Sequence, residues 1–449
     1  MKGPKRDSLY RVTSVVGLAL GLCTSVSAQA GPGDNVRVGA AELSPSVSLV
    51  TEWRSNVYLV ETDPTSGLNF QLVPKIRVDL KGGDMDFALD GQYRARSYMD
   101  SSLSNLNDFS EADVKLDWDI GKGSTIGFKI DDTFSIQTHA TEASYDLDRA
   151  LTTILQNDAS GGVRIRPGGA LSVDIGGRFS YQNIFTPDKA SLADTSANLN
   201  SKTHYGPNVG LKWTFFPKTA FVLNYAYSMF DWDRNVVLAK GDNTGSDTLG
   251  DWLAMPDGTT HRAWGGILGR FTERMVLNLS GGYARLTYDE TSVVAYAPQV
   301  GLSGTDPEVD AVAVGFDADA TGLPDSLLIV AEFEWSPSIA SSVTAGYRKD
   351  ISDSWFTNYV AYHYTFLRYK GLLGSRLGIE GEFGYRAEKY VGEVNRDDQL
   401  VRAQAGTAFK ANRWLQVGLN GYWTRRLSPT SPLAEYDDLG GKLELSFTY

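Results

Sequence analysis

Charged side chains recur at every second position along many segments of this chain, with apolar residues between them. Between Leu377 and Arg386, for example, apolar and aromatic residues share one parity, while Glu380, Glu382 and Arg386 share the other. A surface that carries side chains of both charges sets up an electric field and stays hydrated. Opposite charges on neighbouring strands also form ion pairs with each other. Such charges suit either the lining of an aqueous channel or the stabilisation of a sheet.

We predict a set of channel-lining residues that carry charge and share the polar parity of their segments: Lys75, Arg77, Arg94, Arg96, Asp117, Lys129, Arg164, Arg166, Asp174, Arg178, Arg348, Arg376, Glu380, Glu382 and Arg386. Four further acidic residues share the polar parity of these segments: Asp79, Asp86, Asp90 and Asp131. The pattern favours interfacial belts on a lipid-facing surface, over a sugar-binding path, for these aromatic residues: Trp53, Trp118, Tyr225, Tyr227, Trp335, Tyr362, Tyr364, Tyr385 and Tyr449.

The four histidines are the candidates for catalysis. His139, His204 and His261 fall in loops or at segment ends, and His363 has the parity of the charged face of its segment. Outer-membrane barrel enzymes use a histidine with a serine or aspartate neighbour, and no short motif here joins such a pair. We predict no catalytic residue, and we rank a barrel enzyme third among the function classes.

An acidic connection between Asp289 and Asp325 is the candidate for metal binding. Its DADATGLPD stretch superficially resembles a calcium loop, but it lacks the bidentate glutamate and the ligand order of that motif. The connection is interpreted as a solvated acidic loop. We predict no metal site and no cofactor.

Eighteen segments with period-2 alternation must position these residues, and helical spacing is rare. They cover Val47–Trp53, Asn69–Leu80, Met85–Arg96, Ala112–Ile120, Thr125–Phe134, Ser160–Pro167, Ala170–Tyr181, His204–Phe216, Ala220–Phe230, His261–Phe271, Met275–Tyr288, Ser326–Trp335, Ser341–Asp350, Asn358–Tyr369, Ser375–Arg386, Gln399–Phe409, Leu415–Arg426 and Leu439–Tyr449. The sequence therefore predicts an all-β fold.

The connections alternate in length. Short turns such as KGGD from Lys81 and ANRW from Ala411 join every second pair, and long polar connections join the others. Transmembrane barrels sort their connections in this way. Since eighteen strands enclose a lumen too wide for side chains to fill, the apolar face must point outward to lipid. We predict a transmembrane antiparallel up-and-down β-barrel of about 18 strands.

The first thirty residues are typical of a secretory signal peptide, with a basic start, an apolar run from Val12 to Leu22 and small residues before Ala28 or Ala30. We expect residues 1–30 to be the signal peptide, 31–43 a short periplasmic segment and 44–449 the barrel. The predicted mature chain has no cysteine, because the only one is Cys23. Its net charge is about −15, since the signal holds four of 42 basic and one of 54 acidic residues, which argues against nucleic acid as a partner.

Two segments carry a family resemblance: VSLVTEWRSNVYLVETD (Val47–Asp63) and VTAGYRKDISDSWFTNYVAYHYTF (Val343–Phe366). They resemble the outer-membrane β-barrel proteins grouped as porin-2-like, which are often encoded with exopolysaccharide or capsule export genes. The resemblance implies an integral outer-membrane channel for polysaccharide export, with periplasmic export proteins as partners. The alternative is a general diffusion porin for small polar solutes, and a constriction loop folded into the lumen would favour it.

The last segment alternates Leu443, Leu445, Phe447 and Tyr449 with polar residues and ends on an aromatic residue. It resembles the C-terminal signal that the outer-membrane assembly machinery recognises, although phenylalanine is the commoner last residue. We expect the assembly machinery and outer-membrane lipid to be partners of the chain.

Overall fold

The computed structural model describes residues 35–59, 61, 63–103, 110–139, 152–185, 198–233, 237–239, 251–253, 257–289, 292–299, 308–315, 326–353, 359–391, 396–429 and 435–449. The signal peptide predicted for residues 1–30 lies outside these ranges. Within them the chain forms two sheets, one large and one small. None of the described residues belongs to a helix long and apolar enough to cross a membrane.

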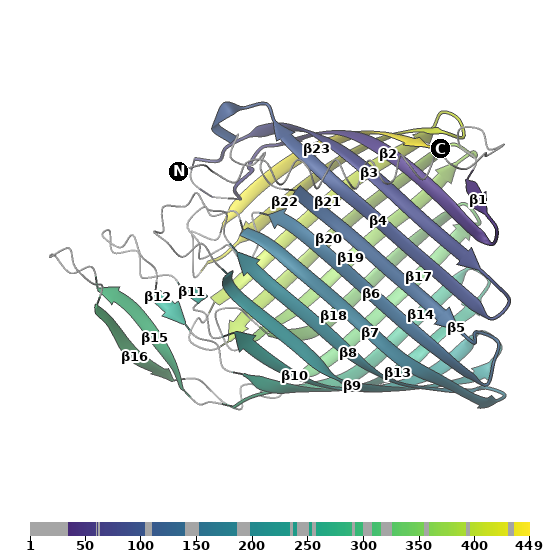
Figure 1. Cartoon of the computed structure of the whole chain (residues 1–449), viewed down its shortest axis with the longest axis horizontal. Helices are drawn as coiled ribbons and strands as arrows, with labels where there is room; N and C mark the ends of the chain where they lie inside the picture. The colour runs from purple at the N-terminus through teal and green to yellow at the C-terminus, as the bar shows by residue number, and fades with distance from the viewer. Residues whose placement is uncertain are drawn as a thin grey trace.

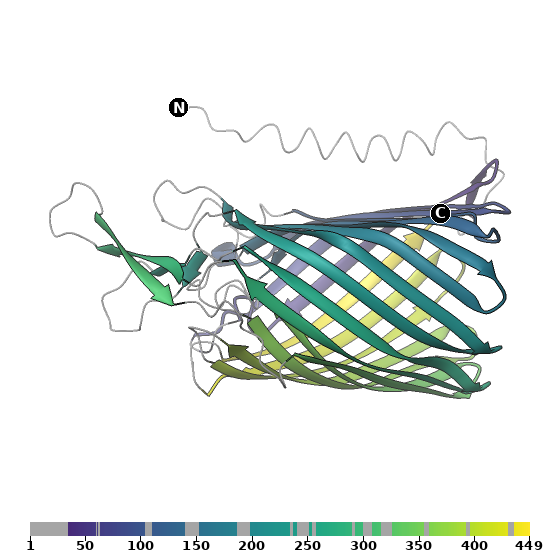
Figure 2. The ribbon, with the colours of Figure 1, turned by 90° about the horizontal axis from the view of Figure 1, so that it is seen from below.

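Eighteen long strands form one closed antiparallel barrel (Figures 1 and 2). They are β2 (Ala41–Arg54), β3 (Gly67–Lys81), β4 (Met85–Tyr98), β5 (Ser110–Ile120), β6 (Ile126–His139), β7 (Thr152–Gly168), β8 (Leu171–Phe185), β9 (Asn198–Phe216), β10 (Thr219–Asp233), β13 (Gly258–Thr272), β14 (Met275–Tyr288), β17 (Leu327–Ser338), β18 (Ser341–Asp353), β19 (Tyr359–Leu373), β20 (Leu377–Val391), β21 (Arg396–Lys410), β22 (Leu415–Leu427) and β23 (Tyr436–Thr448). Each pairs with the next of these along the chain, so the barrel is of the up-and-down type.

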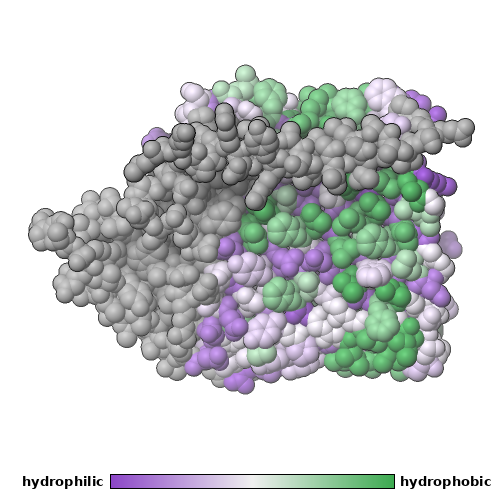
Figure 3. All heavy atoms as spheres, in the orientation of Figure 1, coloured by the Kyte–Doolittle hydropathy of each residue, from purple (hydrophilic) through white to green (hydrophobic). Residues whose placement is uncertain are grey.

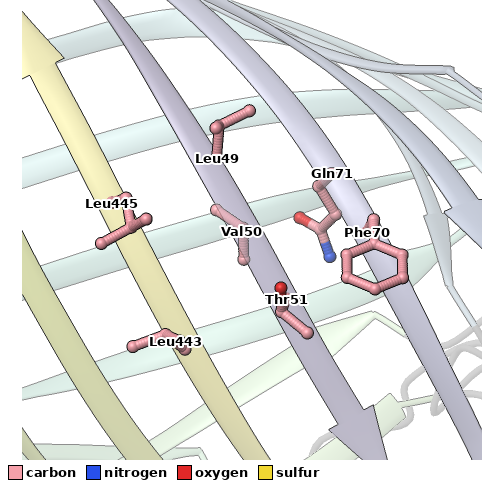
Figure 4. A pocket seen from close by; sticks show the side chains of 7 residues that line it. All are labelled: Leu49, Val50, Thr51, Phe70, Gln71, Leu443 and Leu445. Atoms are coloured by element: carbon pink, nitrogen blue, oxygen red, sulfur yellow. The ribbon is translucent and has the colours of Figure 1, made fainter.

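Closure depends on the first and last barrel strands. β2 pairs with β23 in a register that runs from Ser46 opposite Thr448 to Arg54 opposite Gly440. Figure 4 shows this seam, where side chains of β23, β2 and β3 line a pocket. Because the strands close on themselves, the barrel leaves no unpaired edge, as a structure surrounded by lipid requires.

Apolar side chains cover the outside of the barrel wall. Among the outward residues, Leu49 is 48% exposed and Leu419 is 60% exposed, which would be unusual for leucine in the core of a soluble domain. Figure 3 shows such side chains gathered on the outer surface, especially toward the end with the short turns. The alternation seen in the sequence therefore arises from an apolar exterior and a polar interior.

The two ends of the barrel differ in their connections. One end carries only short turns, such as residues 82–84, 217–218 and 374–376, and Gly374 adopts a φ of 62° in one of them. The other end carries the long connections. There a small sheet forms from β11 (Val237–Ala239), β12 (Asp251–Leu253), β15 (Ser292–Gln299) and β16 (Glu308–Gly315) (Figure 1).

The predicted fold class is confirmed, and each of the eighteen predicted segments corresponds to one barrel strand. β2 begins at Ala41, before the expected start of the barrel at residue 44, and an additional short strand, β1 (Val36–Val38), pairs with its beginning. The small sheet was not predicted, because its strands lie in connections rich in Gly, Asp and Thr, where alternation is weak.

Candidate functional site: the inner wall of the barrel

The strand register decides which side chains face the interior. In β3, Phe70 and Leu72 are 47% and 48% exposed on the outside. Lys75, Arg77 and Asp79 have the opposite parity, and residues that face each other across strands share one side of the sheet. Applying the same rule from strand to strand assigns the inner face around the whole barrel.

Fourteen of the fifteen residues predicted to line a channel lie in strands on the inner face: Lys75, Arg77, Arg94, Arg96, Asp117, Lys129, Arg164, Arg166, Asp174, Arg178, Arg348, Glu380, Glu382 and Arg386. The remaining residue, Arg376, lies in the short turn between β19 and β20. The geometry groups these residues on one surface, and their role in permeation stays a prediction.

Many of the inner charges pair with their neighbours. Arg164 contacts Asp174 at 2.9 Å and Asp119 at 3.2 Å, and Arg368 contacts Glu382 at 2.7 Å. The guanidinium of Arg164 and the carboxylate of Asp174 remain 23% and 46% exposed. Ion pairs this accessible contribute only about 0–1 kcal/mol each. They add little to stability, and they leave a charged, wettable surface on the interior.

A second group of inner charges is buried, at the ends of β20, β21 and β22 that lead to the long connections. Arg426 contacts Glu388 at 2.9 Å and Asp398 at 2.5 Å, and it donates to the hydroxyl of Tyr390 at 2.9 Å. Arg396 also donates to Asp398, at 2.6 Å from its Nε. Both arginines are at most 2% exposed. Sequence reasoning missed this cluster, because an alternating pattern shows facing and says nothing about burial.

At the same end, chain segments fold inward over β2, β3 and β4. Val57 and Leu103, from the connections that follow β2 and β4, pack with Tyr98 above the inner face of Gly67. Leu103 is fully buried and Val57 is 2% exposed. The inward-folded segments 55–59 and 101–103 therefore pack against the inner wall at this mouth, on the side of β2 to β4.

Specific hydrogen bonds hold the two inward-folded segments. Asp438 of β23 pairs with Arg54 at 2.7 Å and accepts the backbone N–H of Asn56 at 3.1 Å. Asp100 accepts the backbone N–H of Ser102 at 2.8 Å, and this bond holds the pKa of the Asp100 carboxyl below its usual value. The Asp438 bonds tie the first segment to β23, whereas the Asp100 bond closes a turn within the connection after β4. Both use charged acceptors, which make stronger bonds than neutral ones.

Two aromatic assignments were wrong. Tyr362 and Tyr364 were expected on the lipid side, but they face the interior, where Arg386 lies 4.3 Å from the Tyr362 ring and Tyr364 donates to Glu382 at 3.0 Å. The stretch from Tyr359 to Phe366 has aromatic or apolar residues at both parities. Its sequence therefore did not decide which face is which.

The interior facing expected for His363 was wrong for the same reason. His363 lies opposite Lys349 on the outside, where the hydroxyl of Tyr347 contacts its Nδ1 at 2.7 Å. His261 is also outward, 2.8 Å from the hydroxyl of Tyr225. His204 faces inward and stacks on Phe230, and the side chain of His139 lies outside the described ones.

In the part of the chain that the structure describes, no three His, Cys, Asp or Glu side chains are grouped as a metal would require. The DADATGLPD stretch, which superficially resembles a calcium loop, lies outside the described residues. The structure therefore does not test the interpretation of that connection.

No family model matches the chain, and no curated protein matches it either. The resemblance of Val47–Asp63 and Val343–Phe366 therefore stays an interpretation of two segments.

Several solved structures resemble the chain. The FrpB iron transporter from Neisseria meningitidis (F3-3 variant) is 9% identical with a TM-score of 0.43, covering 90% of this chain and 81% of that one. OccK3 (OpdO) of Pseudomonas aeruginosa is 11% identical with a TM-score of 0.42, covering 91% and 95%. OpdQ of the same organism is 11% identical with a TM-score of 0.44, covering 91% and 98%. Likenesses this distant say nothing about the function of the chain.

Proposed function

We propose that the chain is an outer-membrane channel through which small polar solutes diffuse. An apolar exterior on a closed barrel suits a bilayer, because every strand finds its backbone partners within the protein. Barrels of 16 to 18 strands are wide enough to leave an aqueous passage. The signal peptide expected at residues 1–30 would direct export across the inner membrane.

The inward-folded segments 55–59 and 101–103 are the reason for proposing small solutes instead of larger ones. They place buried apolar side chains over the inner wall at one mouth, and the segment 55–59 is tied to β23 through Asp438. A passage narrowed in this way discriminates by size. The accessible ion pairs on the rest of the inner wall keep it hydrated and carry both signs of charge. Such a wall suits polar solutes without a strong preference for cations or anions.

Liposome swelling tests this proposal. Purified protein in vesicles should admit monosaccharides readily and tetrasaccharides much more slowly. A Leu103→Ala variant should admit the larger sugars faster, because it removes part of the packing that holds the segment inward. Leu443→Ala on the outer wall is the matched control and should leave the size dependence unchanged. Equal entry of all sugars into wild-type vesicles would contradict a size-selective channel.

Polysaccharide export is the second candidate, and it follows from the family resemblance. One observation favours it: Tyr364 and Phe366 face the interior with their rings stacked at 5.4 Å, next to Arg368 and Glu382. Phe366 is only 9% exposed, so the half-buried Tyr364 ring beside these charges is the face suited to contact with sugar rings. Export through the barrel predicts loss of a surface polysaccharide in a deletion strain with solute entry unchanged, whereas the diffusion channel predicts the opposite.

A further inference from the structure

A carboxylate interrupts the apolar outer face of β6. The outward residues of β6 run from Ile126 through Phe128 and Ile130 to Phe134 and Ile136, and Asp132 stands between Ile130 and Phe134. Its neighbours across the strands are Leu116 and Ala159. Asp132 therefore lies in the middle of the apolar run, where the proposed membrane would surround it with hydrocarbon.

The carboxylate is only half satisfied within the chain. Asn157, outward on β7, donates from its side-chain amide to one oxygen of Asp132 at 2.8 Å. The other oxygen has no hydrogen-bond partner among the described residues. An ionisable group inside a membrane is costly and usually marks a functional contact with a specific partner. We therefore expect the second carboxylate oxygen of Asp132 to accept a hydrogen bond from a group outside its own barrel.

Two small residues of β7 lie next to this pair, between larger apolar side chains such as Phe134 and Phe179. Ala159 lies opposite Asp132, and Gly161 faces Gly177 of β8, all on the outer face. A Cβ added at Gly161 would have one backbone oxygen 3.9 Å away as its near neighbour, so the surface there is open. Figure 3 shows hydrophilic colour within the outer surface of this side of the barrel, between apolar regions. Another wall could approach closely at this place.

We propose that this polar patch, made of Asp132, Asn157, Ala159 and Gly161, binds a second copy of the chain across a two-fold axis parallel to the membrane normal. The inference rests on the proposed placement in a membrane. Two copies inserted in the same direction present the patch at the same depth, and the contact is self-complementary. The second amide N–H of Asn157 in each copy can donate to the free carboxylate oxygen of Asp132 in the other.

The proposed interface is confined to one side of the barrel. On β18, the outward residues Val343, Ala345 and Tyr347 are apolar or aromatic and pair with Trp335, Phe333 and Ala331 of β17. The next outward residue along β18, Lys349, is charged and lies beyond these residues, toward the long connections. The apolar patch around Ala345 is therefore suited to lipid, and it provides a control surface for the test.

Cysteine cross-linking tests the contact directly. Ala159→Cys lies beside the proposed axis, so two copies should be joined by a short bismaleimide in the native membrane. Ala345→Cys is the matched control on β18 and should stay uncoupled. Comparable coupling at both positions, or none at either, would overturn the proposal. Cys23 lies in the predicted signal peptide, so the mature protein should contribute no other thiol.

Two further variants separate association from folding. Gly161→Leu adds apolar surface that lipid accepts but that keeps a second barrel away, and Asp132→Leu removes the carboxylate. Both should halve the mass of the detergent-solubilised protein by light scattering, while heat-modifiable mobility on gels stays normal. An unchanged mass in both variants would overturn the two-fold contact. Recovery of the wild-type barrel outside the membrane fraction would instead contradict the proposed function.

Discussion

The inner wall carries charge pairs at both ends of the barrel, but the pairs at the two ends have different physical roles. Toward the short turns, Arg77 contacts Asp79 at 2.6 Å while its guanidinium stays 54% exposed. Toward the long connections, Arg426 contacts Glu388 and Asp398 with every partner at most 4% exposed. Accessible pairs cost little to break and keep the wall wet, whereas buried pairs must be complete because an unpaired buried charge is expensive. The same residue types therefore serve the lumen at one end and the architecture of the mouth at the other.

The largest effect is expected in the buried cluster. Arg426→Leu leaves Glu388 and Asp398 buried with fewer donors, so the unfolding free energy should fall by about 3–5 kcal/mol. Urea titration of the barrel in detergent, followed by heat-modifiable mobility, measures it. A loss below about 1 kcal/mol would show that the cluster behaves like the exposed pairs.

The next effect compares the outer and inner faces at adjacent positions of β20. Ile379→Arg places a charge on the apolar outside, which should cost about 2–4 kcal/mol if the position lies near the membrane midplane. Glu380→Gln on the inner face should cost far less. Unfolding of the two variants in lipid vesicles gives the comparison, and equal costs would show that the facing is assigned wrongly.

A smaller effect is expected at an exposed pair. Arg77→Gln removes the contact with Asp79 and should change the unfolding free energy by less than about 1 kcal/mol. The same substitution removes a positive charge from the interior, so the preference of the channel for anions over cations should decrease. Reversal potentials across a salt gradient measure this preference. A large loss of stability with an unchanged ion preference would contradict the different roles assigned to accessible and buried ion pairs.

The smallest effect concerns the dependence on pH at the mouth that carries the segment 101–103. Hydrogen bonding lowers the pKa of Asp100 in the folded state, so its bond with Ser102 is present above the ordinary carboxyl pKa and is lost as pH falls through the lowered value. The segment 101–103 should then loosen under strongly acidic conditions. The conductance difference between wild type and Asp100→Ala should shrink as pH falls. A conductance difference that stays constant from neutral to acidic pH would show that ionisation of Asp100 does not affect the mouth.

The sequence predicted the barrel well because two-sided strands leave a strong pattern. In β5, Val114, Leu116 and Trp118 alternate with Lys115 and Asp117, and this period survives wherever one face meets lipid and the other meets water. The pattern failed at β19, where Tyr362 and Tyr364 face inward among apolar neighbours of both parities. Facing there depends on the register with β18 and β20, which a single segment does not contain.

The candidate site was predicted only in part. Alternation identified the inner charges such as Arg164 and Glu382, but it gave no sign that Arg426 and Asp398 are buried together. That cluster joins residues of three strands and depends on which of them meet at the mouth. Asp132 was also missed, because an outward carboxylate matters only once its neighbours on β5 and β7 are known.

Single-channel recording in planar bilayers tests the central claim, that the barrel encloses a water-filled passage, most directly. The purified wild-type protein should insert in discrete steps, with a conductance that is linear in voltage and rises in proportion to salt concentration. Protein that inserts into the bilayer, retains heat-modifiable mobility and yet gives no conductance steps at any salt concentration would contradict the claim.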